Sequence, residues 1–221
     1  MKRKMIAVLC AVLCIGGAAP TSVLAAENVQ FEKNDLEYVS QDDFEVLIET
    51  ILEYKANNPD LTDEEIIELI DNDVNKHKSI FDIWNALTDS EKKLCIRYPF
   101  DALKVNTAKD IATTQTEKMF GVNGLGDRSD AFRHGIWNAE MAVLIGEEKA
   151  ELFATAHEDK DTSGTESDGF SKEDHKNMDL HNNEVGRKIG VENPDASEDE
   201  MAEIIYQEIY AEDTQFIWLH D

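Results

Sequence analysis

Histidine, aspartate and asparagine side chains concentrate in the second half of the chain, where four of the six histidines lie between His134 and His181. Asp130 and His134 are spaced i, i+4, which on a helix brings them close enough for a hydrogen bond or a shared metal ion. Asp179 supplies a further carboxylate. We therefore predict that His134 is catalytic and that Asp130 and Asp179 are ligands of a divalent metal, either zinc or calcium.

The segment 129–145 is predicted to form a helix with an unusual pair of faces. One side is apolar, and the opposite arc combines charged and amide residues with large apolar ones, namely Asp130, Arg133, His134, Trp137, Asn138 and Met141. This mixture is typical of a helix that lines a cleft, in which Arg133, Trp137 and Asn138 contact a substrate. A buried polar network that only fixes helix packing is the alternative.

Two shorter motifs follow this helix. His157 and Glu158 stand at the end of the next predicted helix, where adjacent residues point about 100° apart. They are therefore not expected to bind one metal together, and Glu158 is better suited to be a general base beside a catalytic His157.

The third motif lies on a predicted helix over 176–189. One face of that helix carries Asp179, Asn182, Asn183, Gly186 and Arg187. We expect Asn182, Asn183 and Arg187 to bind substrate, although adjacent asparagines are also common in turns. Gly186 costs about 1 kcal/mol relative to alanine inside a helix, and it would allow another backbone or a ligand to approach closely.

The loop 159–174 begins like a calcium-binding loop. Asp159, Asp161 and Ser163 occupy alternate positions, but Phe170 stands at the twelfth position, where a bidentate glutamate is needed. The loop is thus either a weak calcium site or a solvated acidic loop.

The elements that position these residues are all predicted to be helical. Phe44, Leu47, Ile48 and Ile51 form one helical stripe, and no segment alternates with a period of two residues. Helix signals recur at 62–65, 88–91 and near Ser197, with further helices over 103–120, 147–157 and 176–189. We predict an all-α fold, in which a compact multi-helix domain over 87–221 follows a flexible lead and a short acidic helical region over 26–86.

Residues 1–25 have the order of a cleavable export signal, with three basic residues, an apolar run and small residues near Ala25. Removal of this segment takes away three of the 21 lysines and arginines and none of the 47 acidic residues, which changes the net charge from −26 to −29. We expect a secreted or cell-wall-associated product that has no membrane span and does not bind nucleic acid. Cys95 is then the one cysteine left, so no internal disulfide is expected.

Three ordered motifs resemble an uncharacterised bacterial domain family that occurs in secreted and cell-wall-associated proteins. They are Asp130-Ala-Phe-Arg-His134-x-x-Trp137-Asn138, Ala156-His157-Glu158, and Met178-Asp179-x-x-Asn182-Asn183-x-x-Gly186-Arg187. The resemblance covers roughly residues 87–190 and implies no settled activity. Neither the segment 26–86 nor the calcium-like loop has support from it.

Two classes of function are consistent with these residues. The first is a hydrolase of a cell-envelope polymer, a peptide or a lipid, in which a metal ion activates water or a histidine–carboxylate pair acts as general base without metal. The second is a secreted binding module without catalysis, whose acidic surface attracts calcium or a basic protein partner.

Overall fold

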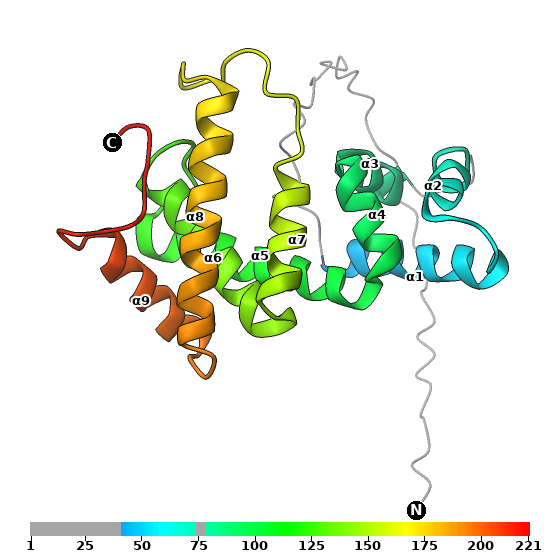
Figure 1. Ribbon diagram of the computed structural model, residues 1–221, viewed down its shortest axis with the longest axis horizontal. Coiled ribbons are helices and arrows are strands. Elements are labelled where there is room, and N and C mark those ends of the chain that lie inside the picture. Colours follow the sequence, from blue (N-terminus) through cyan, green and yellow to red (C-terminus); the bar gives the residue numbers. More distant parts are fainter. Residues whose placement is uncertain (1–40, 74–77) are drawn as a thin grey trace, which may run out of the picture. The chain divides into compact units, whose positions relative to one another are not determined.

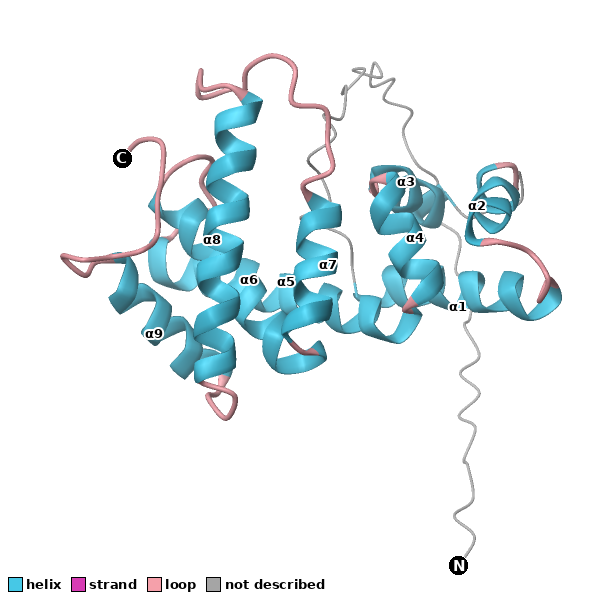
Figure 2. Ribbon diagram, in the orientation of Figure 1, coloured by secondary structure: helices cyan, strands magenta, loops and turns pink. Residues whose placement is uncertain are grey.

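The computed structural model describes residues 41–73 and 78–221, and its regular structure in this part of the chain is helical, without strands (Figures 1 and 2). The predicted export signal and the flexible lead up to residue 40 lie outside the described residues. The all-α prediction is confirmed. In chain order, the helices are α1 Gln41–Asn57, α2 Asp63–Asp71, α3 Lys78–Ala86, α4 Asp89–Arg97, α5 Pro99–Phe120, α6 Arg128–Ile145, α7 Glu147–His157, α8 Lys172–Glu192 and α9 Glu198–Ile209.

Helix α6 lies at the centre of the core and packs against α5, α7, α8 and α9. Its apolar residues Phe132, Ile136 and Ala139 are fully buried, and its polar residues Asp130 and Asn138 are also buried. The helix therefore has no fully exposed residue. Because most of it is buried, its buried polar residues must find their partners inside the protein.

Small residues allow α6 and α8 to approach each other closely. A Cβ atom added to Gly186 would lie 2.1 Å from the carbonyl oxygen of Gly135, and one added to Gly190 would lie 2.4 Å from that of Ala139. We expected either another backbone or a ligand next to Gly186, and the structure places the backbone of α6 there. This contact brings the polar face of α8 directly onto that of α6.

Several helix ends follow the predicted capping residues. Thr62, Thr88 and Ser197 each open a helix with a reciprocal capping box. Two boundaries were predicted wrongly. Helix α5 begins at Pro99 instead of residue 103, because proline is well tolerated in the first turn. Helix α8 begins after the cap Ser171 and continues through Gly190, whose missing side chain serves packing against Ala139.

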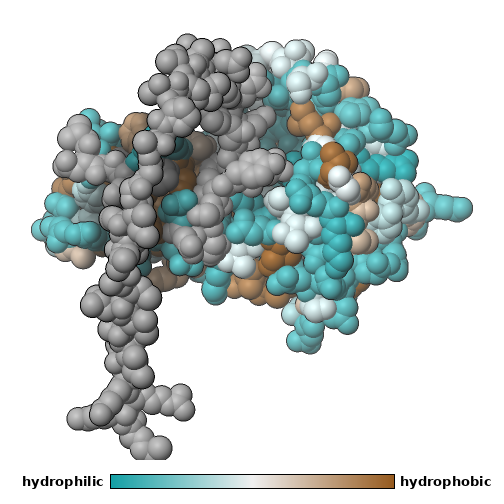
Figure 3. All heavy atoms as spheres, turned by 180° about the vertical axis from the view of Figure 1, so that it is seen from behind, coloured by the Kyte–Doolittle hydropathy of each residue, from teal (hydrophilic) through white to brown (hydrophobic). Residues whose placement is uncertain are grey.

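The acidic N-terminal helices share the core of the rest of the chain. Residues from Phe44 on α1 to Phe216 near the C-terminus form one buried apolar cluster, and α1 packs against α5. Within the described ranges, no helix combines the length and apolar character needed to cross a bilayer. The face shown in Figure 3 is largely hydrophilic, with apolar residues in small separate groups.

Candidate metal centre and active-site cleft

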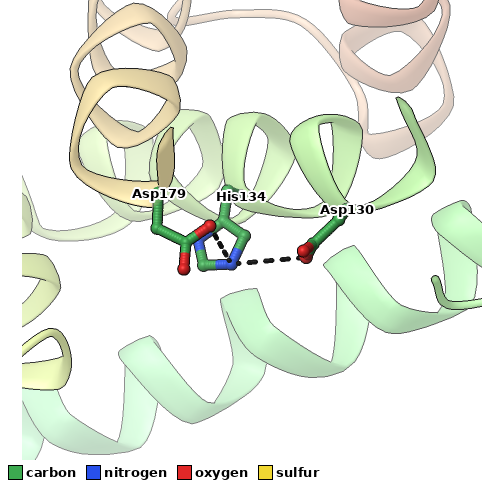
Figure 4. Close-up of side chains that lie close together, drawn as sticks. All are labelled: Asp130, His134 and Asp179. Carbon is green, nitrogen blue, oxygen red and sulfur yellow. Dashed lines mark ion pairs between the residues drawn. The ribbon is translucent and has the colours of Figure 1, made fainter. Parts of the chain in front are cut away.

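Asp130, His134 and Asp179 converge where α6 and α8 meet. The His134 Nε2 atom lies 3.5 Å from Asp130 Oδ1 and 3.3 Å from Asp179 Oδ1. Figure 4 shows that Asp179 reaches from α8 toward the imidazole, while the other two side chains come from α6. The ligand atoms of all three residues lie within 4.8 Å of one another, so this group could hold a metal ion. Tetrahedral zinc ligands are typically separated by about 3.3 Å, close to the spacing found here.

A chain of buried hydrogen bonds determines which nitrogen of His134 faces the two carboxylates. Arg187 can only donate, and its Nη1 donates to Asn138 Oδ1 over 3.0 Å. The Asn138 amide nitrogen therefore donates to Asn183 Oδ1 over 2.6 Å. This Asn183 oxygen also lies 3.1 Å from His134 Nδ1, which must then carry the hydrogen. As a result, His134 Nε2 presents a lone pair toward Asp130 and Asp179, as a metal ligand requires.

Neighbouring charges shift the pKa values of Asp130, His134 and Asp179 in different directions. Burial favours the neutral form of Asp130, but the nearby Arg133, His134 and the Gly126 N–H together lower the pKa of this carboxyl. The Gly126 N–H donates to Asp130 Oδ2 over 2.7 Å, and Arg133 forms an ion pair with Oδ1. Asp130 is thus held as a carboxylate in a fixed orientation.

Burial and the neighbouring Asp130 and Glu158 raise the pKa of Asp179 well above its usual value. Burial and the positive charge of Arg133 lower the pKa of His134 to about 4. The imidazole is therefore neutral at physiological pH. Asp179 Oδ1 is buried without a hydrogen-bond donor among the described residues. A divalent cation or a proton at this position would relieve the repulsion between the carboxylates.

A cleft with a volume of about 840 Å³ opens beside this group. Nine residues predicted to form a site line it together, namely Asp130, Arg133, His134, Trp137, His157, Glu158, Asp159, Asp161 and Asp179. The predicted substrate-binding residues Asn138, Asn183 and Arg187 are buried behind the cleft instead, where they orient His134.

His157 and Glu158 contact different residues. His157 Nδ1 lies 2.8 Å from Glu91 Oε1, and its ring packs edge-on against Trp137 with centroids 5.2 Å apart. Glu158 is buried, and its Oε1 lies 4.0 Å from His134 Nδ1. Because this Glu158 oxygen has no hydrogen-bond donor within the described structure, it is available to accept a proton.

Asn182 is not among the residues that line the cleft, whereas Asp159 and Asp161 of the calcium-like loop line it but already have hydrogen-bond partners. The Asn182 amide donates to the carbonyl of Ile217 and accepts from its N–H, so it anchors the C-terminal tail. Asp161 accepts hydrogen bonds from the N–H and the hydroxyl of Ser163, and Asp159 accepts from Ser90. One oxygen of Asp159 and both oxygens of Asp161 thus accept hydrogen bonds from protein donors.

Some cleft residues escaped the sequence analysis. Glu91 carries only the signal of a capping-box residue, and nothing in its spacing connects it to His157. His175 Nε2 lies 2.9 Å from Asp168 Oδ2, beside Gly126, whose N–H donates to Asp130. Glu91 and His175 are far from Asp130 in the sequence, so no helical periodicity connects them with it.

The fold and the site together define an all-helical protein with a buried Asp–His–Asp group at the floor of a polar cleft. The chain belongs to the family described as Domain of unknown function (DUF6973), whose model matches residues 92–213. Membership of an uncharacterised domain family was expected from the motifs, and the match extends beyond the predicted end at 190 to include α9. Neither curated proteins nor solved structures gave a match to the chain.

Proposed function

We propose that this chain is an exported metal-dependent hydrolase whose metal is held by Asp130, His134 and Asp179. The observation that carries the proposal is the His134 lone pair, which faces two carboxylate oxygens at 3.3 and 3.5 Å. Asp179 Oδ1 has no hydrogen-bond donor among the described residues, and a bound cation would remove the repulsion between Asp179 and the Asp130 carboxylate.

The ligand set favours zinc over calcium. Calcium takes six to eight oxygen ligands, whereas one imidazole nitrogen with two carboxylates suits zinc. Three protein ligands leave a coordination position open to the cleft, which is the arrangement of catalytic zinc sites. A zinc ion held there would lower the pKa of a bound water molecule.

The residues around the metal ligands have complementary roles. Glu158 would take a proton from water activated there, because its buried side chain lies next to His134 and its Oε1 has no hydrogen-bond donor among the described residues. Asn183 keeps His134 in the tautomer that can bind metal. The cleft is large enough to hold a substrate segment. If the chain is exported from a bacterium, envelope polymers, peptides and lipids are the substrates to test.

The test compares the mature chain with Asp179→Asn and the matched exposed control Asp213→Asn. Zinc binding is measured by calorimetry, and the metal content of purified protein by elemental analysis. We expect one zinc per chain, at least a tenfold weaker affinity in Asp179→Asn and no change in Asp213→Asn. Hydrolysis of model esters, amides and phosphate esters should fall with zinc occupancy.

Two results would oppose the proposal. Equal zinc binding by the mature chain, Asp179→Asn and Asp213→Asn would show that Asp179 does not bind the metal and would refute the proposed metal centre. Zinc binding without hydrolysis of any substrate class, in protein that keeps its fold, would favour a binding module in place of an enzyme.

A further inference from the structure

The residues where α4 and α7 meet form a second polar group in the cleft. Glu91 Oε2 accepts the Thr88 N–H over 2.8 Å as part of the α4 capping box, while its Oε1 faces His157 Nδ1 at 2.8 Å. Although burial opposes it, the contacts with His157 and the Thr88 N–H lower the pKa of Glu91. One carboxylate thus caps a helix and orients an imidazole.

Additional hydrogen bonds lock the two helix ends together. Thr88 Oγ1 donates to the carbonyl of Ala156 over 2.8 Å, and Ser90 Oγ donates to Asp159 over 2.6 Å. Because these contacts bracket His157, the position of its ring is determined by α4 as well as by its own helix.

His157 Nε2 and Lys160 Nζ lie 3.1 Å apart at the cleft wall. The indole of Trp137 packs edge-on against both the His157 and the His134 imidazoles. Lys160 also acts electrostatically on Asp179, as does Arg133 from α6. Two cations therefore lie close to the metal group, and they come from different helices or loops.

The cleft is richer in basic residues than the rest of this acidic chain. It is lined by six of the 16 lysines and arginines in the described residues, namely Lys92, Lys109, Arg133, Lys160, Lys172 and Lys176. Lys172 and Lys176 are spaced i, i+4 on α8, and they lie on the same face of this helix as Asp179. Eight acidic residues line the same cleft, whereas the other described residues hold 35 acidic residues against ten basic ones, so the cleft is far less acidic than the rest of the chain. The two positive charges of a divalent ion would balance the formal charge of this lining, which would allow an anionic ligand to bind.

We infer that Arg133, His157 and Lys160 form a subsite for a phosphoryl group, so that the substrate of this cleft is a phosphate ester. The choice of substrate class rests on the proposed function, since a divalent ion would neutralise Asp130 and Asp179 and so reduce the negative charge beside Arg133 and Lys160. Because an ammonium can only donate, His157 Nε2 accepts from Lys160 Nζ and holds this group at the cleft wall, where its other hydrogens can bind a phosphate oxygen. The same cations would stabilise the charge that develops on a transferring phosphoryl group.

The subsite is tested by calorimetric titration of inorganic phosphate into zinc-loaded mature protein from which excess zinc has been removed. Lys160→Ala removes one cation, and Glu91→Gln keeps an oxygen for the Thr88 cap but loses the carboxylate beside His157. Lys188→Ala is the matched control, because Lys188 is exposed on α8 and pairs with Glu184. Circular dichroism confirms that each variant folds.

We expect the dissociation constant for phosphate to rise about tenfold in Lys160→Ala and about fivefold in Glu91→Gln, with Lys188→Ala within a factor of two. Acetate should bind more weakly than phosphate. Phosphate binding that persists in Asp179→Asn would show that the subsite exists without the metal centre. If phosphate binds in this way but zinc does not bind to the unaltered protein, the proposed function would be refuted and the phosphate subsite would stand.

Three results would overturn the inference. The first is the absence of phosphate binding to the unaltered protein. The second is an equal loss of binding in Lys188→Ala, which would show a general charge effect. The third is loss of binding in Asp179→Asn but not in Lys160→Ala, which would place the phosphate on the metal alone and leave the proposed function standing.

Discussion

Replacement of Gly186 by alanine tests whether the close approach of α6 and α8 builds the metal centre. The new Cβ would lie 2.1 Å from the Gly135 carbonyl oxygen and 2.7 Å from its Cα, whereas ordinary contact begins at 3.4 Å. Since these neighbours are backbone atoms, no side chain can turn away. The two helices would have to separate by about 1 Å or more.

The expected loss of stability follows from two opposing contributions. Overpacking against backbone costs about 3 kcal/mol, and the better helix propensity of alanine offsets about 1 kcal/mol of that. The net loss of about 2 kcal/mol corresponds to a decrease in Tm of about 4–8 °C for a chain of this size.

The same separation should weaken metal binding. It would lengthen the distance between Asp179 on α8 and His134 on α6, which is 3.3 Å in the structure. Metal–ligand distances tolerate deviations of only about 0.2 Å, so we expect zinc affinity to fall at least tenfold.

Thermal unfolding by circular dichroism and zinc titration by calorimetry measure both effects, with Lys188→Ala as the exposed control on the same helix. An unchanged Tm and zinc affinity in Gly186→Ala would refute the view that backbone contact positions Asp179.

Three further outcomes are expected. Asn183→Ala should weaken zinc binding about 10- to 100-fold, because His134 loses the partner that determines its tautomer; unchanged calorimetric affinity would contradict this. Zinc affinity should rise with pH, because Asp179, whose pKa is raised by burial and neighbouring carboxylates, must release its proton; titrations in two buffers of different ionisation enthalpy count the protons released. Burial and Glu198 raise the pKa of Glu140 to about 7, so the folded state binds more protons than the unfolded state between roughly pH 4.5 and 7, and stability falls as pH rises through this range. Glu140→Gln should therefore raise stability by about 1–2 kcal/mol at pH 8 and change it little at pH 4.5, as measured by urea unfolding.

Periodicity and capping residues were sufficient to predict most helices. The stripe from Phe44 to Ile51 predicted α1, and the capping boxes at Thr62 and Ser197 predicted where α2 and α9 begin. These signals depend on contacts within about four residues, so they are present in the local sequence. Boundaries failed where a glycine such as Gly190 served tertiary packing, because a glycine that ends a helix and one that admits a neighbour look the same in sequence.

The sequence by itself determined that the fold is all-helical and that Asp130 and His134 share a helix face, because both follow from the 3.6-residue period. Only the tertiary structure decided which distant residues join them. The close contact of α8 with α6 at Gly186 and Gly135 brought Asp179 to the imidazole and placed Asn183 and Arg187 behind the cleft, while Asn182 bonds to the backbone of Ile217 in the tail. Likewise, Glu91 reaches His157 through the packing of α4 on α7. The face of a helix on which a residue lies determines which contacts it could make. The angle and distance at which two helices pack determine which of these contacts form.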